Sequence, residues 1–471
     1  MLKKTIITFL LSIMLLSLSA NLTLERAVEM AIENNNDLQI AKQDIEIALH
    51  NYNNVRGQLF PQINLNMRLS HSTNNLPPAR IPPAFSLLDN LPAPNPSFNE
   101  LFIAGAIDEM MANLLPSRRT KENSFATQVQ MQQLVFSGGR LINGLRVLDK
   151  VKTIQEKRYQ LVLQNTLITV TNAYFDLYLA QEGLSIQRQA LENAERHYSR
   201  VEALFTQGLV SEFDKLRAEL EVARLHPQLL ELENMKNLAE ENFKRIIGFT
   251  GNVELSPNVD MLAITVMNFD ITLEEAQRMA RNNRIELNLI DIMTEISRVQ
   301  YNVERVNFLP NALLQADVTS YNASSPFSFE GDNFGTMASV GFMLQVPLFT
   351  GLSNSSKTLR ARNELKRAEI EAVNTQELIN LEIRQTWQAF NQSKRLVEIQ
   401  EQNILLALRA LNIAIARFEN QTGIQLEVFD AQIQYNAALM ALSSANIRII
   451  KDYFALQKAI GNDLNTIIGG R

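Results

Sequence analysis

The stretch "PQINLNMRLSHS", residues 61–72, decides the fold, because its side chains alternate in character. From Ile63 to Ser70, every apolar residue is followed by a polar one. This period of two places the apolar and the polar side chains on opposite faces of a β-strand. A soluble sheet would turn the apolar face to a protein core, whereas an outer-membrane strand would turn it to lipid. The rest of the chain has to distinguish these two readings.

Composition excludes several classes of protein. The chain has 471 residues, which predicts several domains or an elongated shape, and its net charge of -6 argues against a nucleic-acid partner. It contains no cysteine, so we expect no disulfide, thiolate metal site or lipid-anchored cysteine. The four histidines lack metal-ligand spacing, and no nucleophile motif or phosphate loop is present. We therefore expect no enzyme activity, no cofactor and no metal.

The N-terminal residues 1–20 resemble an export signal. Lys3 and Lys4 precede a short apolar run, and small residues allow cleavage near Ala20. The run is too short to span a bilayer comfortably, and no later stretch has the roughly 20 apolar residues of a membrane helix. Entry into a membrane would therefore require a β-barrel.

The chain contains one unit twice. "LTLERAVEMA" at 22–31 matches "ITLEEAQRMA" at 271–280, and "LVFSGG" at 134–139 matches "PLFTGL" at 347–352. The two offsets, 249 and 213 residues, predict a first structural repeat over 21–248 and a second over 271–461. A linker at 249–270 joins the repeats, and a tail follows at 462–471.

Each repeat is expected to contain two strands, at about 62–72 and 123–135 in the first and at about 311–321 and 336–348 in the second. Leu65 maps onto Leu314 and Val129 onto Phe342, so the repeats agree on the apolar face. Four strands cannot close a barrel, whose smallest members have about eight, so several chains must contribute. A soluble sheet is the alternative, but nothing else in the chain is a candidate to cover the apolar face. The polar side chains expected to face a lumen are Asn64, Asn66, Gln128, Gln130, Gln132 and Gln345.

The extra residues of the first repeat fall at 74–122, which holds eight of the 14 prolines. Proline removes backbone donors, so this stretch predicts a long loop, with a short helix possible at 100–115. Because it joins two barrel strands on the side away from the long helices, we expect it to be extracellular.

Long helical hairpins are predicted at about 139–247 and 352–460. Their first helices carry apolar residues in alternating steps of three and four, which is a coiled-coil seam. Gly208 and Gly423 mark the hairpin-tip turns, where glycine permits the positive φ that ends a helix. Pro227 predicts a kink in the first return helix. The seam residues are Leu191, Ala194, Tyr198, Val201 and Phe205, followed 213 residues later by Ile404, Ala407, Leu411, Ala414 and Phe418.

The ordered set "QLFPQ", "NFLPN", "FSGG", "FTGL" and "RFENQTGIQLEVFDA" (417–431) resembles the TolC-type outer-membrane efflux family. The resemblance implies a mainly helical homotrimer in the outer membrane, with a 12-stranded barrel in lipid that continues into a 12-helix periplasmic tube. It implies a passive duct for efflux or type I secretion, opened by a periplasmic adaptor and an inner-membrane pump of RND, ABC or MFS type. The alternative is a periplasmic coiled-coil adaptor or scaffold without a pore, which would normally show one hairpin.

Glu427 and Asp430 lie three residues apart, hence on one helix face. The family has acidic residues at matching positions, where they line the closed periplasmic entrance, so three copies would hold six carboxylates. The alternative is that both acids stabilise the positive end of a helix. The first repeat offers only Asp214. Some members of the family hold the entrance shut with a tyrosine and an arginine near this turn. Here Phe418 has no hydroxyl and the turn offers Gly423 and Gln425, so closure would rely on packing or on Arg417.

Overall fold

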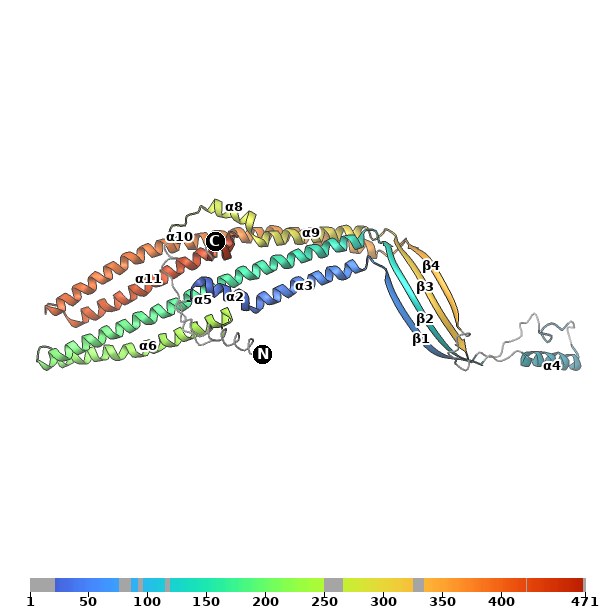
Figure 1. Cartoon of the computed structure of the whole chain (residues 1–471), viewed down its shortest axis with the longest axis horizontal. Coiled ribbons are helices and arrows are strands. Elements are labelled where there is room, and N and C mark those ends of the chain that lie inside the picture. The colour runs from blue at the N-terminus through green and yellow to red at the C-terminus, as the bar shows by residue number, and fades with distance from the viewer. Residues whose placement is uncertain are drawn as a thin grey trace, which may run out of the picture. The chain divides into compact units, whose positions relative to one another are not determined.

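The computed structural model describes residues 22–75, 86–91, 96–114, 119–249, 266–324, 334–420 and 422–468 (Figure 1). The chain divides into two compact units. One unit comprises Met1–Tyr52, Arg146–Tyr301 and Leu359–Arg471, and the other comprises Asn53–Leu145 and Asn302–Thr358.

The second unit contains a four-stranded antiparallel sheet in the order β1-β2-β3-β4. Its strands are β1 (Gln62–Asn75), β2 (Arg119–Phe136), β3 (Asn311–Ser324) and β4 (Gly335–Gln345). Helix α4 (Phe98–Leu114) lies between β1 and β2 in sequence, close to the predicted 100–115.

Four of the predicted strand limits differ from the structure: the end of β1, the start of β2, and the ends of β3 and β4. β1 and β2 continue pairing as far as Asn75 opposite Arg119, so the expected loop at 74–122 is shorter. The apolar alternation stops at Leu69, and the added pairs are mostly polar, so the sequence pattern could not reveal them. β4 ends at Gln345 rather than 348. Pro347 explains this early end, because it has no backbone N–H to continue the ladder.

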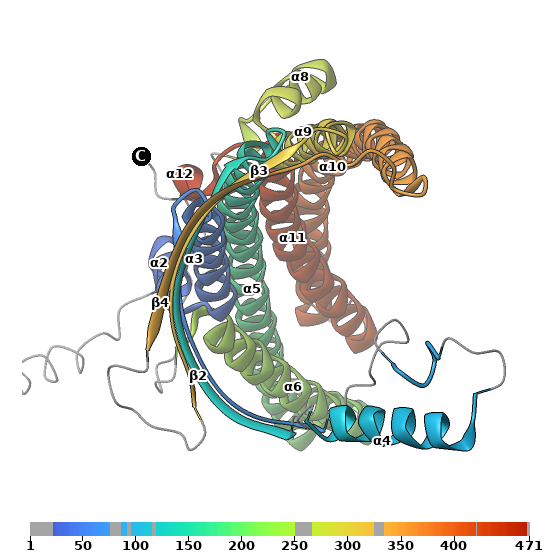
Figure 2. The ribbon, with the colours of Figure 1, turned by 90° about the vertical axis from the view of Figure 1, so that its right-hand side faces the viewer.

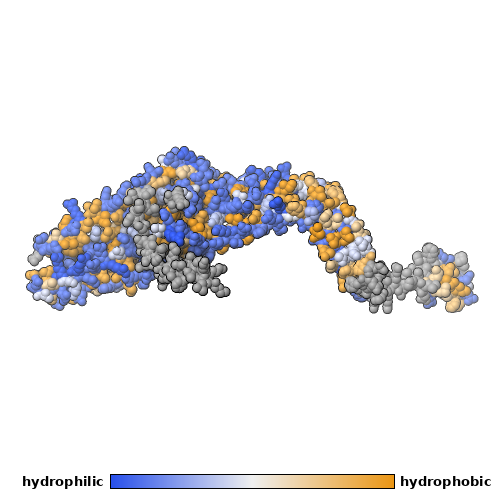
Figure 3. Space-filling view, in the orientation of Figure 1, coloured by the Kyte–Doolittle hydropathy of each residue, from blue (hydrophilic) through white to orange (hydrophobic). Residues whose placement is uncertain are grey.

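The register separates the sheet into an apolar and a polar face. Leu65 is opposite Val129, which is in turn opposite Val318, and such neighbours share a face. The adjacent row, one residue along, consists of Asn64, Gln130 and Asp317. Hydrophobic side chains accordingly gather over the strands in Figure 3.

Most of the first unit is made of two long helical hairpins. The hairpins are α5 (Arg140–Thr206) with α6 (Glu212–Ile247), and α10 (Ser353–Glu419) with α11 (Gln425–Ala459). Both first helices have 67 residues and are offset by 213 at each end. All ten predicted seam residues are buried or half-buried. Helix α6 includes Pro227 without an interruption.

Shorter helices accompany the hairpins: α2 (Leu24–Asn34), α3 (Asn36–Gly57), α8 (Leu273–Asn283), α9 (Ile285–Arg305) and α12 (Leu464–Ile468). Among the helices that the structure describes, none is both long and apolar enough to cross a membrane.

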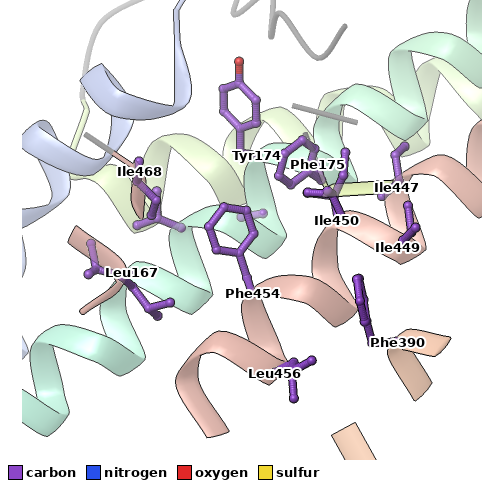
Figure 4. Packing of buried hydrophobic residues seen from close by; sticks show 14 of the residues in the cluster. Leu167, Tyr174, Phe175, Phe390, Ile447, Ile449, Ile450, Phe454, Leu456 and Ile468 are labelled. Carbon is purple, nitrogen blue, oxygen red and sulfur yellow. The ribbon is translucent and has the colours of Figure 1, made fainter. Parts of the chain in front are cut away.

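The core of the first unit lies where α5 and α11 pack together, and Figure 4 shows Tyr174, Phe175 and Phe454 within it. Both repeats anchor their first short helix to this core in the same way. The Tyr174 hydroxyl donates to the carbonyl of Leu22 at 3.0 Å, and the Trp387 indole donates to the carbonyl of Ile271 at 2.8 Å. These pairs are related by the two repeat offsets, so the internal repeat extends to individual hydrogen bonds.

Two glycines end the return helices at equivalent places. Gly248 has φ +68° and Gly461 has φ +80°, a region that favours glycine. A Cβ on Gly461 would lie 2.7 Å from the carbonyl carbon of Asn283 and 2.8 Å from the backbone nitrogen of Arg284. A Cβ on Gly248 would lie 2.5 Å from the Cβ of Asn34. Each return helix therefore needs a residue without a side chain to reach the end of α2 or α8.

Gly461→Ala should destabilise the folded chain. The left-handed backbone alone costs an alanine about 1–2 kcal/mol, and the contact with backbone atoms adds to this. We expect the thermal unfolding temperature to fall by several degrees. Gly144→Ala is the matched control, because nothing lies near its position and alanine favours a helix. Equal unfolding temperatures for the two variants would contradict the packing assigned to Gly461.

Candidate functional site

The first hairpin turn is closed by Gly208, whose φ is +73°. The N–H of Gly208 donates to the carbonyl of Phe205 and the N–H of Leu209 to that of Leu204, both at 2.9 Å. This pair of bonds satisfies the last carbonyls of α5 and requires the left-handed conformation that glycine adopts without strain.

Asp214, the acid that the first repeat offers, is engaged in starting α6. Its Oδ2 accepts from the Ser211 hydroxyl at 2.6 Å and from the Ser211 N–H at 3.2 Å. The Ser211 hydroxyl oxygen in turn accepts from the N–H of Asp214 at 3.2 Å, which completes a capping box. The structure thus gives Asp214 a role in the helix start.

The second turn uses glycine for a different reason from the one predicted. Gly423 does not have a positive φ, so that expectation is wrong. Instead, a Cβ on Gly423 would lie 3.0 Å from the Arg417 Cβ and 3.1 Å from the Glu427 Oε2. The N–H groups of Thr422 and Gly423 both donate to the carbonyl of Arg417, at 2.9 and 3.0 Å. The absence of a side chain at Gly423 lets Arg417 and Glu427 approach each other.

Glu427 and Asp430 differ in their surroundings. Glu427 lies in the first turn of α11, and its Oε2 is 3.1 Å from the Arg417 Nη1. That contact is an ion pair without hydrogen-bond geometry, because Oε2 is buried and accepts no hydrogen bond from the described residues. Asp430 is exposed one turn further along. The first acid is thus partly compensated by Arg417, whereas the second faces solvent.

The two hairpins contact each other close to these turns. Arg200 of α5 forms an ion pair with Glu419 of α10 at 2.7 Å. The Phe418 ring packs against the His197 ring of α5, with centroids 5.4 Å apart. Phe418 therefore joins the hairpins by packing and not by a polar latch.

The register places all six residues expected to face a lumen on the polar face of the sheet. Asn64 pairs with Gln130, Asn66 with Gln128 and Gln62 with Gln132. Gln345 pairs with Asn311 at the end of the same face. The polar row continues across β3 and β4 through Asp317, which accepts a hydrogen bond from Ser339 at 2.5 Å.

The apolar face is exposed in the single chain. Along β1, Ile63, Leu65, Met67 and Leu69 are 58–70% exposed, and Val340 of β4 is 79% exposed. A contiguous apolar surface of this kind marks a site of contact with lipid or protein.

A set of four phenylalanines at the strand ends was missed by the sequence reasoning. Phe60 precedes β1, Phe136 ends β2, Phe308 precedes β3 and Phe349 follows β4, and all four are exposed. They stand at the strand ends that adjoin α3, α5, α9 and α10 in sequence. Aromatic girdles at the membrane–water interface have this placement. The sequence did contain a signal for these residues, because a phenylalanine recurs at the end of every predicted strand that adjoins a predicted helix.

Among the described residues, no group of three or more histidine, cysteine, aspartate or glutamate side chains is arranged to hold a metal ion. The polar residues that the hairpin tips bring together form ion pairs and helix caps instead. The arrangement provides a polar sheet face, an apolar sheet face and a pair of charged hairpin tips.

The sequence of the chain matches the profile of a known protein family. The profile of the outer membrane efflux protein family matches residues 27–249 and 277–462, which together make up most of the chain. The chain belongs to this family. The match includes both hairpins and all four strands, which does not favour the adaptor reading.

Curated relatives are distant but extend over most of the chain. The outer membrane efflux protein BepC of Brucella suis is 21% identical over 71% of each chain. The outer membrane protein TolC of Escherichia coli is 22% identical over 72% of this chain and 70% of its own. The alkaline protease secretion protein AprF of Pseudomonas aeruginosa is 19% identical over 62% of this chain and 60% of its own.

Solved structures show the same fold. CusC superposes with a TM-score of 0.76 at 17% identity, covering 95% of this chain and 96% of CusC. The CmeC outer membrane channel of Campylobacter jejuni gives a TM-score of 0.72 at 16% identity, covering 93% of this chain and 85% of CmeC. The protein is thus an outer-membrane efflux protein that extends into the periplasm.

Proposed function

We propose that this chain forms, as a homotrimer, the passive exit duct of a tripartite efflux or type I secretion system. The observation that carries the proposal is the open sheet with one exposed apolar face. Within the described residues, β1 and β4 each pair on one side only. Because neighbouring strands are antiparallel, β4 of one copy and β1 of the next continue the alternation. Four strands from each of three copies then close a 12-stranded barrel.

The hairpins support the same assembly through the internal repeat. In Figures 1 and 2, α11 and α5 lie side by side between α10 and α6. An ion pair of 2.5 Å between Lys451 and Asp176 joins α11 to α5. The 213-residue offset maps α5 onto α10 and α11 onto α6. The equivalent contact pairs α10 of one copy with α6 of the next, and repeating it closes a tube of 12 helices.

The outer faces of α6 and α10 have the surface that such a contact needs. Phe429 and Lys451 of α11 map onto Leu216 and Leu238 of α6, which are 56% and 72% exposed. On α10, apolar residues recur every seven positions and are also exposed. They are Ile399, Leu406 and Ile413. A heptad of this kind is typical of a coiled-coil face, and a second copy of the chain would bury it.

The entrance lies at the hairpin tips in this proposal. Three copies of Glu427 and Asp430 would converge where the tube is narrowest. Confined carboxylates attract cations. The ion pair with Arg417 partly offsets the negative charge of Glu427, so Asp430 supplies the exposed charge. Arg417 also ties the end of α10 to the start of α11, which would stiffen the tip.

With the hairpin tips at the periplasmic entrance, the positions of the other parts of the chain follow. The polar sheet face lines the lumen, the apolar face contacts outer-membrane lipid, and the segment between β1 and β2 lies outside the cell. The tips meet a periplasmic adaptor and an inner-membrane pump. The relatives include both efflux and secretion proteins, and the proposed duct serves either. A periplasmic scaffold is less well supported, because it leaves the apolar face of the sheet uncovered.

A charge on the apolar face should impair barrel assembly. Met131 lies on that face, opposite Ile63 and Ala316, whereas its neighbour Gln130 lies on the polar face. Arginine at the bilayer midplane costs about 2–4 kcal/mol per site, and a trimer would carry it three times. We expect Met131→Arg to lower the yield of outer-membrane trimer strongly, and Gln130→Arg to preserve it. Equal trimer yields would refute the assignment of the two faces.

The acidic tips should make the pore cation-selective. In planar bilayers we expect cation selectivity and a block by divalent or trivalent ions added from the periplasmic side. Glu427→Gln combined with Asp430→Asn should relieve the block and reduce the selectivity without changing the trimer yield. If both properties persist in the double variant, these acids serve only the start of α11, and the entrance ring is wrong.

A further inference from the structure

The contact between the two hairpins contains a half-buried histidine that the duct as proposed does not use. His197 of α5 lies between Phe418 of α10 and Phe429 of α11, with ring centroids 5.4 and 5.1 Å away. Its Nε2 is buried and has no hydrogen-bond partner among the described residues. One imidazole therefore joins both helices of the second hairpin to the first hairpin, in the last turns of α5.

Two carboxylates near His197 are each paired with an arginine. On α5, Arg196 and Arg200 are nearby, and Arg200 pairs with Glu419 of α10 at 2.7 Å. On α6, Glu221 pairs with Arg224 at 2.7 Å. From α11, the residues that line the adjoining cavity are uncharged in the described structure. The two carboxylates are thus each paired with an arginine, and the phenylalanine rings and Arg200 beside the imidazole disfavour a further positive charge there.

Burial lowers the pKa of His197, and the neighbouring Arg200 lowers it further. An exposed histidine has a pKa of about 6.5. Above that pH, His197 is neutral whether the hairpins are together or apart, so its ionisation does not affect the contact. As the pH falls below about 6.5, separated hairpins bind a proton that packed hairpins do not. Lowering the pH therefore weakens the packing of the two hairpins. This weakening continues until the pH reaches the lower pKa that His197 has in the packed hairpins.

We propose that His197 is a pH-sensitive clasp that holds the two hairpins of one chain together when neutral and releases them when protonated. This inference rests on the proposed duct, in which separating the hairpins widens the periplasmic entrance. An adjoining cavity of about 440 Å³, lined in part by Asn193, Gln432 and Asn436, lies beside the imidazole. Polar side chains there allow water to reach the charged ring once the contact loosens.

The internal repeat restricts the clasp to one of the two hairpin contacts. The residue equivalent to His197 in the second repeat is Ala410, and the equivalent of Phe429 is Leu216. At this point the contact between neighbouring copies would thus have an alanine in place of the histidine and a leucine in place of the phenylalanine. Acid should loosen the three contacts within chains and leave the three contacts between copies intact. The entrance would then open without dissociation of the trimer.

The separation of the hairpins tests the clasp directly. The chain has no cysteine, so Ser199→Cys with Asn412→Cys introduces one spin-label pair in each chain, on exposed positions of α5 and α10. In the detergent-extracted trimer, lowering the pH from 7.5 to 5.5 should raise the population with separated labels about tenfold, since one pH unit below the free pKa changes the equilibrium by that factor. With His197→Phe added, the label distances should not change with pH.

Two further variants make the test specific. His226→Phe removes an exposed histidine of α6 and should keep the full acid response. Ala410→His adds a histidine to the contact between copies and should add a second, acid-induced separation there. An unchanged label distance in the parent protein at pH 5.5, or an equal response in His197→Phe, would overturn the clasp.

Conductance distinguishes this inference from the proposed function. In planar bilayers, the parent trimer should conduct more at pH 5.5 than at pH 7.5, and His197→Phe should not. If the labels separate in acid but no variant ever conducts, the clasp stands and the duct fails. If the trimer conducts and the labels do not respond to acid, the duct stands and the clasp fails.

Discussion

In the part of the chain that the structure describes, the four-stranded sheet has two open edges, and these impose the constraint on which the rest of the structure depends. An edge strand presents a row of unpaired backbone N–H and C=O groups, and each unpaired group costs several kcal/mol in hydrocarbon. The same sheet exposes an apolar face that water disfavours. Lipid around the apolar face and further strands at both edges remove both penalties together. Four strands are too few to close a barrel alone, and the proposed duct draws the others from further copies of the chain.

The chain contains one structural unit twice, and the places where the two repeats differ are informative. The anchoring bonds of Tyr174 and Trp387 are equivalent, as are the close contacts of Gly248 and Gly461. The hairpin tips diverge, because Asp214 caps a helix whereas Glu427 pairs with Arg417. The core of the first unit thus preserves the repeat, whereas the tips of the two hairpins depart from it.

Sequence patterns predicted the elements well because their periodicity is strong. The seam of α5 and α10 repeats every seven residues, and the alternation of β1 is unbroken from Ile63 to Leu69. The polar ends of β1 and β2 carry no such alternation, so their full length was missed. The role of Gly423 and the pairing of Glu427 were also beyond the sequence, because both depend on how closely Arg417 approaches across the turn. His197 lacked a motif, and its burial between Phe418 and Phe429 emerges only when three helices pack.

The central claim is that three copies complete the barrel and the tube. Single-particle electron cryo-microscopy of the protein extracted from outer membranes with mild detergent tests it most directly. The account predicts particles with threefold symmetry, a closed barrel in which β4 of each copy pairs with β1 of the next, and α6 packed on α10 between copies. Particles with one copy and an open sheet, or with a different number of copies around the axis, would contradict it.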